Sequence, residues 1–151
     1  MLRRRAYTLV ELAIVVLVLG ILAGVAAPKY VDSLAYFRVE AAAKRIAADM
    51  QYARRQAIQT ATAQPIAFDT LLDEYTLTNS ADIDHAGVVY VVHLEDEGYP
   101  ADITAADFGG DANVSFDHEG VADSAGSVTV MSGGHARTVT IALPHTIAIT
   151  P

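Results

Sequence analysis

Glu11 is the residue best placed to do chemistry in this sequence, because it is a carboxylate inside an uncharged segment. No other charged side chain occurs between Tyr7 and Ala27. As a helix, this segment would be about 31 Å long, which matches the hydrocarbon core of a bilayer. A carboxylate there costs about 2.5 to 3.5 kcal/mol at the helix centre and less near the helix end. We therefore expect a specific cationic partner to neutralise Glu11.

The other candidates for chemistry do not form a catalytic motif. The sequence has no phosphate-binding glycine loop, no His-Glu-x-x-His pair and no Gly-x-Ser-x-Gly turn. Ser115, Asp117 and His118 have the residue types of a hydrolytic triad, but near neighbours on one strand end point in different directions. The histidines are not spaced like zinc ligands. We expect neither catalysis nor a cofactor.

Three groups of acidic residues could offer oxygen ligands to calcium. They are Asp82 with Asp84, residues 95–97, and Asp107 with Asp111. None of the groups has the spacing of a calcium-binding loop, and a solvated, solubilising acidic surface accounts for all three. The prediction is that there is no metal site.

Charge is distributed unevenly along the chain. Residues 61–151 hold fourteen of the eighteen acids and one base, Arg137, for a net formal charge of −13. Such a domain repels nucleic acid. Arg3, Arg4 and Arg5 precede the apolar segment, so the positive-inside tendency predicts a cytoplasmic amino terminus and an exported remainder. There are no cysteines, so neither disulfides nor cysteine-bound metals contribute.

Two ordinary interpretations fit the amino-terminal residues in part. A cleavable secretory signal would explain the basic start, the apolar stretch and the small residues near Ala27, but Glu11 interrupts that stretch and Pro28 follows the cleavage candidate. A plain signal anchor would use Thr8 and Glu11 as a capping box, in which each side chain accepts a free backbone N–H at the start of the helix.

A third interpretation rests on the residue string itself. Arg-Arg-Arg-Ala-Tyr-Thr-Leu-Val-Glu at residues 3–11, followed by the apolar stretch, resembles the class III signal sequence of type IV pilins and type II secretion pseudopilins. The resemblance implies that a prepilin peptidase cuts between Ala6 and Tyr7 on the cytoplasmic side and methylates the new terminus. Glu11 becomes the fifth mature residue and Pro28 the twenty-second, where the family keeps a glutamate and often a proline. The family usually has glycine and phenylalanine in place of Ala6 and Tyr7.

The cut would give Glu11 its cationic partner. It would expose an amine near the bilayer, and the Glu11 carboxylate of a neighbouring subunit could pair with that amine inside a low-dielectric bundle of helices. In an isolated protomer the same carboxylate would be unfavourable in lipid. The pair would therefore favour entry into a filament.

The elements that must position this segment can also be predicted. A single helix is expected from about Thr8 to about Gln59, because apolar residues continue at helical spacing beyond Pro28 and form one stripe. The stripe comprises Val39, Ala43, Ile46, Met50, Ala53 and Ala57. Pro28 removes one backbone hydrogen bond and can kink the helix. Two pairs of opposite charge at i,i+4, Glu40 with Lys44 and Arg45 with Asp49, are expected on the solvated opposite face.

After Thr60 the apolar period changes to two, which predicts strands. Residues 66–68 and 75–77 should form a first hairpin, with Pro65 at an edge or before the strand begins. Residues 88–94 are almost continuously apolar, which predicts a covered strand. At least four strands of an antiparallel meander are expected over the last third. Glycine and proline turns at Gly133-Gly134 and Pro144-His145 separate them.

The carboxyl-terminal pattern, over about residues 113–150, is similar to the globular part of the GspH/FimT group of minor pseudopilins and pilins. The expected fold is α+β and pilin-like, a long amino-terminal helix packed on a small antiparallel β domain. The expected organisation is a leader at 1–6, a transmembrane and assembly helix at 7–28, an amphipathic helix at 29–60 and the β domain at 61–151.

The resemblance implies a non-enzymatic minor pseudopilin of a type II secretion pseudopilus, anchored in the inner membrane with a periplasmic domain before assembly. Its partners would be other pseudopilins or pilins, the prepilin peptidase and membrane lipid, but not nucleic acid. A minor pilin of a type IV pilus shares the same assembly residues, Glu11 and Pro28, and stays open as an alternative. So does a signal-anchored periplasmic binding domain or enzyme, which would tolerate Glu11→Val.

Overall fold

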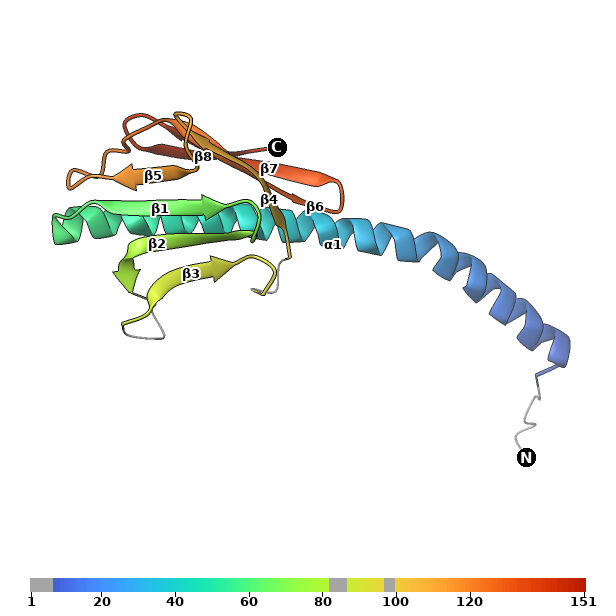
Figure 1. Ribbon diagram of the computed structural model, residues 1–151. Helices are drawn as coiled ribbons and strands as arrows, with labels where there is room; N and C mark the ends of the chain where they lie inside the picture. Colours follow the sequence, from blue (N-terminus) through green and yellow to red (C-terminus); the bar gives the residue numbers. More distant parts are fainter. Residues whose placement is uncertain (1–6, 82–86, 97–99) are drawn as a thin grey trace. The chain divides into compact units, whose positions relative to one another are not determined.

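The computed structural model describes residues 7–81, 87–96 and 100–151. They form one helix, α1, over Leu9–Thr60, followed by eight strands (Figure 1). The chain divides into two compact units between Leu34 and Ala35, and α1 contributes to both of them. The expected fold class, one long helix packed on antiparallel sheets, is confirmed.

The first unit is the amino-terminal part of α1. The side chains from Tyr7 to Ser33 are all exposed, although most of them are apolar. Within the described residues, α1 is the one helix long and apolar enough to cross a membrane. Pro28 lies inside the helix and does not end it. The predicted single helix from Thr8 to Gln59 is therefore confirmed to within a residue at each end.

The second unit contains two four-stranded sheets, in both of which every pair of strands is antiparallel. The first has the order β3-β2-β1-β5. Its strands are β1 (Gln64–Asp69), β2 (Glu74–Ala81), β3 (Val89–His93) and β5 (Asn113–Phe116). The β1–β2 pair is the predicted first hairpin, and its register places Ile66 opposite Leu77.

The second sheet has the order β4-β6-β7-β8. Its strands are β4 (Asp102–Phe108), β6 (Gly126–Ser132), β7 (His135–Ala142) and β8 (Thr146–Thr150). The predicted meander is confirmed for β6, β7 and β8, and Gly133 and Gly134 turn the chain with positive φ angles. The strand at Val114–Phe116, expected to join them, pairs with β1 instead.

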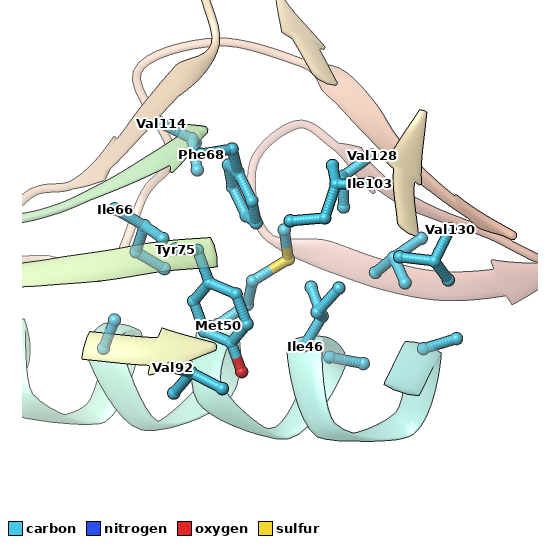
Figure 2. Packing of buried hydrophobic residues seen from close by; sticks show 14 of the residues in the cluster. Ile46, Met50, Ile66, Phe68, Tyr75, Val92, Ile103, Val114, Val128 and Val130 are labelled. Atoms are coloured by element: carbon cyan, nitrogen blue, oxygen red, sulfur yellow. The ribbon is translucent and has the colours of Figure 1, made fainter. Parts of the chain in front are cut away.

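The core of the second unit lies where the carboxyl-terminal part of α1 meets both sheets. Every member of the predicted apolar stripe is fully buried. Figure 2 shows Ile46 and Met50 of the helix among side chains from both sheets. Those labelled are Ile66, Phe68, Tyr75, Val92 and Val114 from the first sheet and Ile103, Val128 and Val130 from the second. Met50 suits this position because its flexible thioether side chain fills irregular gaps.

Two strand expectations were wrong in detail. β1 is a central strand, not an edge, but its pairing with β2 begins only at Ile66, so Pro65 is paired with β5 alone. A missing N–H is tolerated there because one side of the strand is still open. The apolar run at 88–94 forms an edge strand, β3, whose residues alternate between exposed and buried. Its continuous hydrophobicity reflects valines on the solvent face rather than two covered faces.

Gly126→Ala is expected to destabilise the second unit by about 3 kcal/mol, because the close approach of β4 leaves no room for a side chain. A Cβ at this position would lie 2.1 Å from the carbonyl oxygen of Asp107 and 2.5 Å from Cα of Phe108. Urea unfolding of the full chain in detergent would measure the loss. Gly24→Ala is the control, since a Cβ there meets no atom within 4 Å. Equal unfolding midpoints for the two variants would contradict the tight β4–β6 contact.

Candidate assembly site and the contacts that anchor the helix

Glu11 lies in the first turn of α1, where its backbone forms a hydrogen bond that its side chain does not take part in. Its backbone N–H donates to the Thr8 hydroxyl oxygen at 3.2 Å, which is one half of the expected capping box. Among the described residues, no hydrogen bond or ion pair involves the Glu11 carboxylate. The cap therefore uses the backbone N–H of Glu11 and not its charge.

The other predicted site residues lie along the same unit. Tyr7 is exposed two residues before the helix begins, Pro28 is inside the helix, and Ala6 falls outside the described residues. The apolar side chains around Glu11 are exposed to a degree that water does not favour, such as Leu9 at 85% and Leu12 at 62%. The structure thus leaves Glu11 in an apolar surface that is suited to burial.

In the second unit, Asp49 anchors the helix to the first sheet. Its side chain is only 11% exposed, so the expectation of a solvated pair with Arg45 was wrong. Arg45 Nε donates to Asp49 Oδ2 at 2.9 Å, and the Tyr75 hydroxyl on β2 donates to the same oxygen at 2.6 Å. The Arg45 guanidinium also donates to the hydroxyl of Tyr90 on β3. The i,i+4 spacing of Arg45 and Asp49 could not predict the contacts with Tyr75 and Tyr90, because these tyrosines lie far along the chain.

These contacts shift the titration of the groups around Asp49. Burial, followed by the nearby Asp49 carboxylate, raises the pKa of Tyr75 well above its ordinary value. The same two causes raise the pKa of Tyr90. Burial of the Arg45 guanidinium is the largest single effect and opposes its charge, but the hydrogen bonds and charge interactions with Asp49 and Tyr90 together outweigh it and raise the pKa of Arg45. At neutral pH both tyrosine hydroxyls and the Arg45 guanidinium therefore keep the protons that they donate in these hydrogen bonds.

A second set of contacts joins the helix to β7 through Arg137, the one base of residues 61–151. Its Nε donates to Glu40 Oε2 at 2.8 Å, and its guanidinium lies 4.9 Å from the ring centroid of Tyr36. Lys44 Nζ is 3.2 Å from the other Glu40 oxygen. Arg137 thus joins β7 to the helix through a hydrogen bond and a contact with an aromatic ring.

Removing Arg137 is expected to raise the pKa of Glu40. The hydrogen bond from Arg137, followed by that from Lys44, holds the pKa of this carboxyl below its usual value of 4.5. A folded pKa below the unfolded one stabilises the protein above the unfolded pKa, and the gain is lost as pH falls through the folded pKa. The Arg137→Gln variant should therefore be less stable than the native chain at neutral pH. On acidification its stability should fall by less than that of the native chain, because less of it depends on ionised Glu40.

Carbon-13 NMR of the Glu40 carboxyl in the detergent-solubilised chain would measure that shift. Lys44→Gln is the matched control and should raise the pKa of Glu40 by less, because Arg137 is the larger cause. A larger shift from Lys44→Gln than from Arg137→Gln would refute the assignment.

Of the three residues with the types of a hydrolytic triad, Asp117 holds a loop together. Asp117 Oδ1 accepts backbone N–H groups from Glu119 at 2.9 Å and Val121 at 2.8 Å, which closes the loop after β5. The Val121 N–H, followed by that of Glu119, lowers the pKa of Asp117. Arg54 on the helix donates to the Gly120 carbonyl at 3.1 Å. The loop is therefore docked on α1, and its carboxylate is occupied by backbone groups.

Among the described residues, Asp107 and Asp111 are not part of a cluster of possible metal ligands, whereas Glu95 is. Asp82, Asp84 and Glu97 lie outside the described residues. Asp107 and Asp111 each accept a hydrogen bond within their own loop, from Gly110 and Asn113. The fold instead gathers Asp73, Glu95 and Asp102, whose carboxylate oxygens lie within 4.8 Å of one another. This group could not be predicted from the sequence, because its three residues are far apart along the chain.

Comparison with known proteins agrees with this architecture. A family model described as type II transport protein GspH matches residues 42–144, and one described as prokaryotic N-terminal methylation motif matches residues 1–27. A comparison with curated proteins finds no match.

Solved structures are similar in fold. Two crystal forms of the type IV minor pilin FimU from Pseudomonas aeruginosa are 18% and 17% identical to this chain. They cover 75% and 74% of it and 88% and 92% of their own length, each with a TM-score of 0.52. The minor pseudopilin EpsH from the type 2 secretion system of Vibrio cholerae is 10% identical and has a TM-score of 0.54. That alignment covers 75% of this chain and 96% of the other.

Proposed function

This chain belongs to the GspH family of type II transport proteins, and we propose that it is a minor pseudopilin, a non-enzymatic subunit assembled into a pseudopilus through its amino-terminal helix. One combination of observations carries the proposal. The methylation motif lies at the start of the same helix whose later part packs on the β domain of the family, and the apolar stretch of that helix up to Ala27 contains a single carboxylate. An anchor alone would not need the carboxylate.

The proposed assembly begins with processing. Cleavage between Ala6 and Tyr7 leaves a methylated amine one residue before Thr8. Because Thr8 caps α1 through its own hydroxyl, the helix can begin at the same place in the mature chain. The amine and the Glu11 carboxylate then lie at one end of the apolar segment. Each is unfavourable in lipid without an opposite charge.

Pairing between subunits lets the two charges neutralise each other, so neither is left in lipid without a partner. The amine of one subunit would meet the Glu11 carboxylate of its neighbour while their exposed apolar side chains pack together. In that low-dielectric surrounding an ion pair is strong if its geometry is good, and a lone charge is costly. Pro28 lacks a backbone N–H, so it leaves one carbonyl of the preceding turn free and provides a place where the helix can adjust to its neighbours.

The proposed location follows from the same segment. Before assembly, the protein would be anchored in the inner membrane, with Arg3 to Arg5 on the cytoplasmic side and the acidic β domain in the periplasm. Prepilin peptidase would act on it there, and other pseudopilins would be its partners in the filament.

A minor pilin of a type IV pilus is the second candidate. Its support is the fold likeness to FimU, which is described as a type IV minor pilin. Deletion of the gene in the source bacterium separates the two. A pseudopilin should be needed for export of folded proteins across the outer membrane and a pilin for surface pili, each restored by the intact gene. Normal export together with normal piliation would refute both candidates.

A further inference from the structure

Among the sheet edges that the structure describes, β8 is the one without a charged residue, a register shift or a loop bonded to it. Exposed edges offer unpaired backbone groups and are usually blunted by charges, bulges, short length or a covering loop. The other three described edges have such features. β4 carries Asp102 and Asp107 and a shifted register, β3 also has a shifted register, and the loop residue Asp123 bonds to Ser115 on β5.

β8 is regular and uncharged over its whole length. Its five residues pair with β7 without a register shift, and none is charged or a proline. Thr146, Ala148 and Thr150 are exposed, whereas Ile147 and Ile149 are half-buried and pack against the core. Proline occurs at 144 and at 151, so the open edge is bounded at both ends.

The sequence of β8, Thr-Ile-Ala-Ile-Thr, reads the same in both directions. Two such strands can therefore pair antiparallel with every residue opposite its equivalent. Thr146 would face Thr150 of the other copy, and Ile147 would face Ile149. Pairs of threonine and of β-branched residues are favourable across strands. Both isoleucines of each copy would stay on the core side of a continuous sheet.

The distribution of charge favours β8 over other surfaces as the place where two copies of the chain meet. The chain has a net charge of −8, and residues 61–151 alone carry −13, so two copies repel each other over most of their surface. Pairing through β4 would bring carboxylates close together. Pairing through β8 brings none opposite one another, because residues 126–136, 138–142 and 146–150 contain no Asp, Glu, Lys or Arg.

We propose that β8 pairs antiparallel with β8 of a second copy of this chain, with Ala148 on the two-fold axis. Such an interface has the same patch on both copies. It adds one strand pair and is small compared with the roughly 1,000 Å² of a stable interface, so the pairing is weak and reversible. It does not depend on the proposed assembly through Glu11.

Cysteine cross-linking tests this directly, because the chain has no cysteine of its own. Facing residues of antiparallel strands have Cα atoms about 4.5 to 5.5 Å apart, which suits a disulfide. Ala148→Cys in the full chain, in membranes under mild oxidant, should give severalfold more disulfide-linked dimer than Ala105→Cys. Ala105 is an exposed alanine on β4 of the same sheet. Equal yields from the two variants would overturn the proposal.

The register provides a second readout. Co-expressed Thr146→Cys and Thr150→Cys chains should cross-link to each other, whereas either alone should cross-link poorly. Adding Ala148→Glu to both chains should abolish that product, and Ala148→Glu in one with Ala148→Lys in the other should restore it, since like charges opposite one another destabilise a strand pair. Strong cross-linking by Thr146→Cys alone, or no effect of the charges, would exclude this antiparallel register.

Discussion

Replacing Glu11 by valine is expected to leave the protein inserted in the membrane with a folded β domain but to exclude it from filaments. Removing one member of a buried ion pair costs about 3 to 5 kcal/mol, because the remaining charge is left without a partner. That corresponds to at least roughly a hundredfold loss of incorporation, at about 1.4 kcal/mol for each factor of ten. Sheared pseudopili, probed for this subunit, would measure it.

Two further variants separate the charge of Glu11 from its place in the helix cap. Glu11→Gln keeps the side-chain length and should fail almost as completely as valine, because it cannot neutralise an amine. Thr8→Ala removes the cap to the Glu11 N–H and should cost only about 1 kcal/mol of helix stability. If the valine variant enters filaments normally, the pairing role is wrong, and a simple membrane anchor becomes the better account.

Replacing Asp49 by alanine is expected to destabilise the second unit by about 3 kcal/mol, the largest effect we expect from a polar residue there. It would leave the buried Tyr75 hydroxyl without its acceptor and Arg45 without its carboxylate. A buried donor that loses its partner carries its full desolvation penalty. Urea unfolding followed by near-ultraviolet circular dichroism would report the change through the tyrosines.

Tyr75→Phe is the matched control for Asp49. It removes one hydrogen bond but keeps the ring in the core and the Arg45–Asp49 pair, so about 1 kcal/mol is expected. Unfolding midpoints for Asp49→Ala that equal those of the native chain would mean that the helix is held on the first sheet by apolar packing alone.

The sequence predicted those parts of the fold that have a simple period. The helix and its buried stripe, the first hairpin and the β6–β7–β8 meander follow from apolar spacings of 3.6 and two residues. β4 was missed because a register shift between Ile103 and Ala105 interrupts the alternation of its side chains. β3 was misjudged because exposed valines, Val89 and Val91, resemble buried ones in sequence.

The long-range contacts were beyond sequence reasoning for a different reason. Asp49 with Tyr75, and Glu40 with Arg137, are joined only after the sheets pack on the helix, and no local pattern encodes that approach. The amino-terminal site is the opposite case. The prediction of Ala6, Tyr7, Glu11 and Pro28 needed only residue order along one helix and the family resemblance, and it stays a prediction until the mature chain is examined.

The central claim is that processing frees the amine that Glu11 neutralises. Mass spectrometry of the protein from a membrane fraction, with the terminal peptide sequenced, tests it most directly. We expect the chain to begin at Tyr7 with a methylated amine. A mature chain that begins at Met1, or at Pro28 after ordinary signal cleavage, would contradict the account.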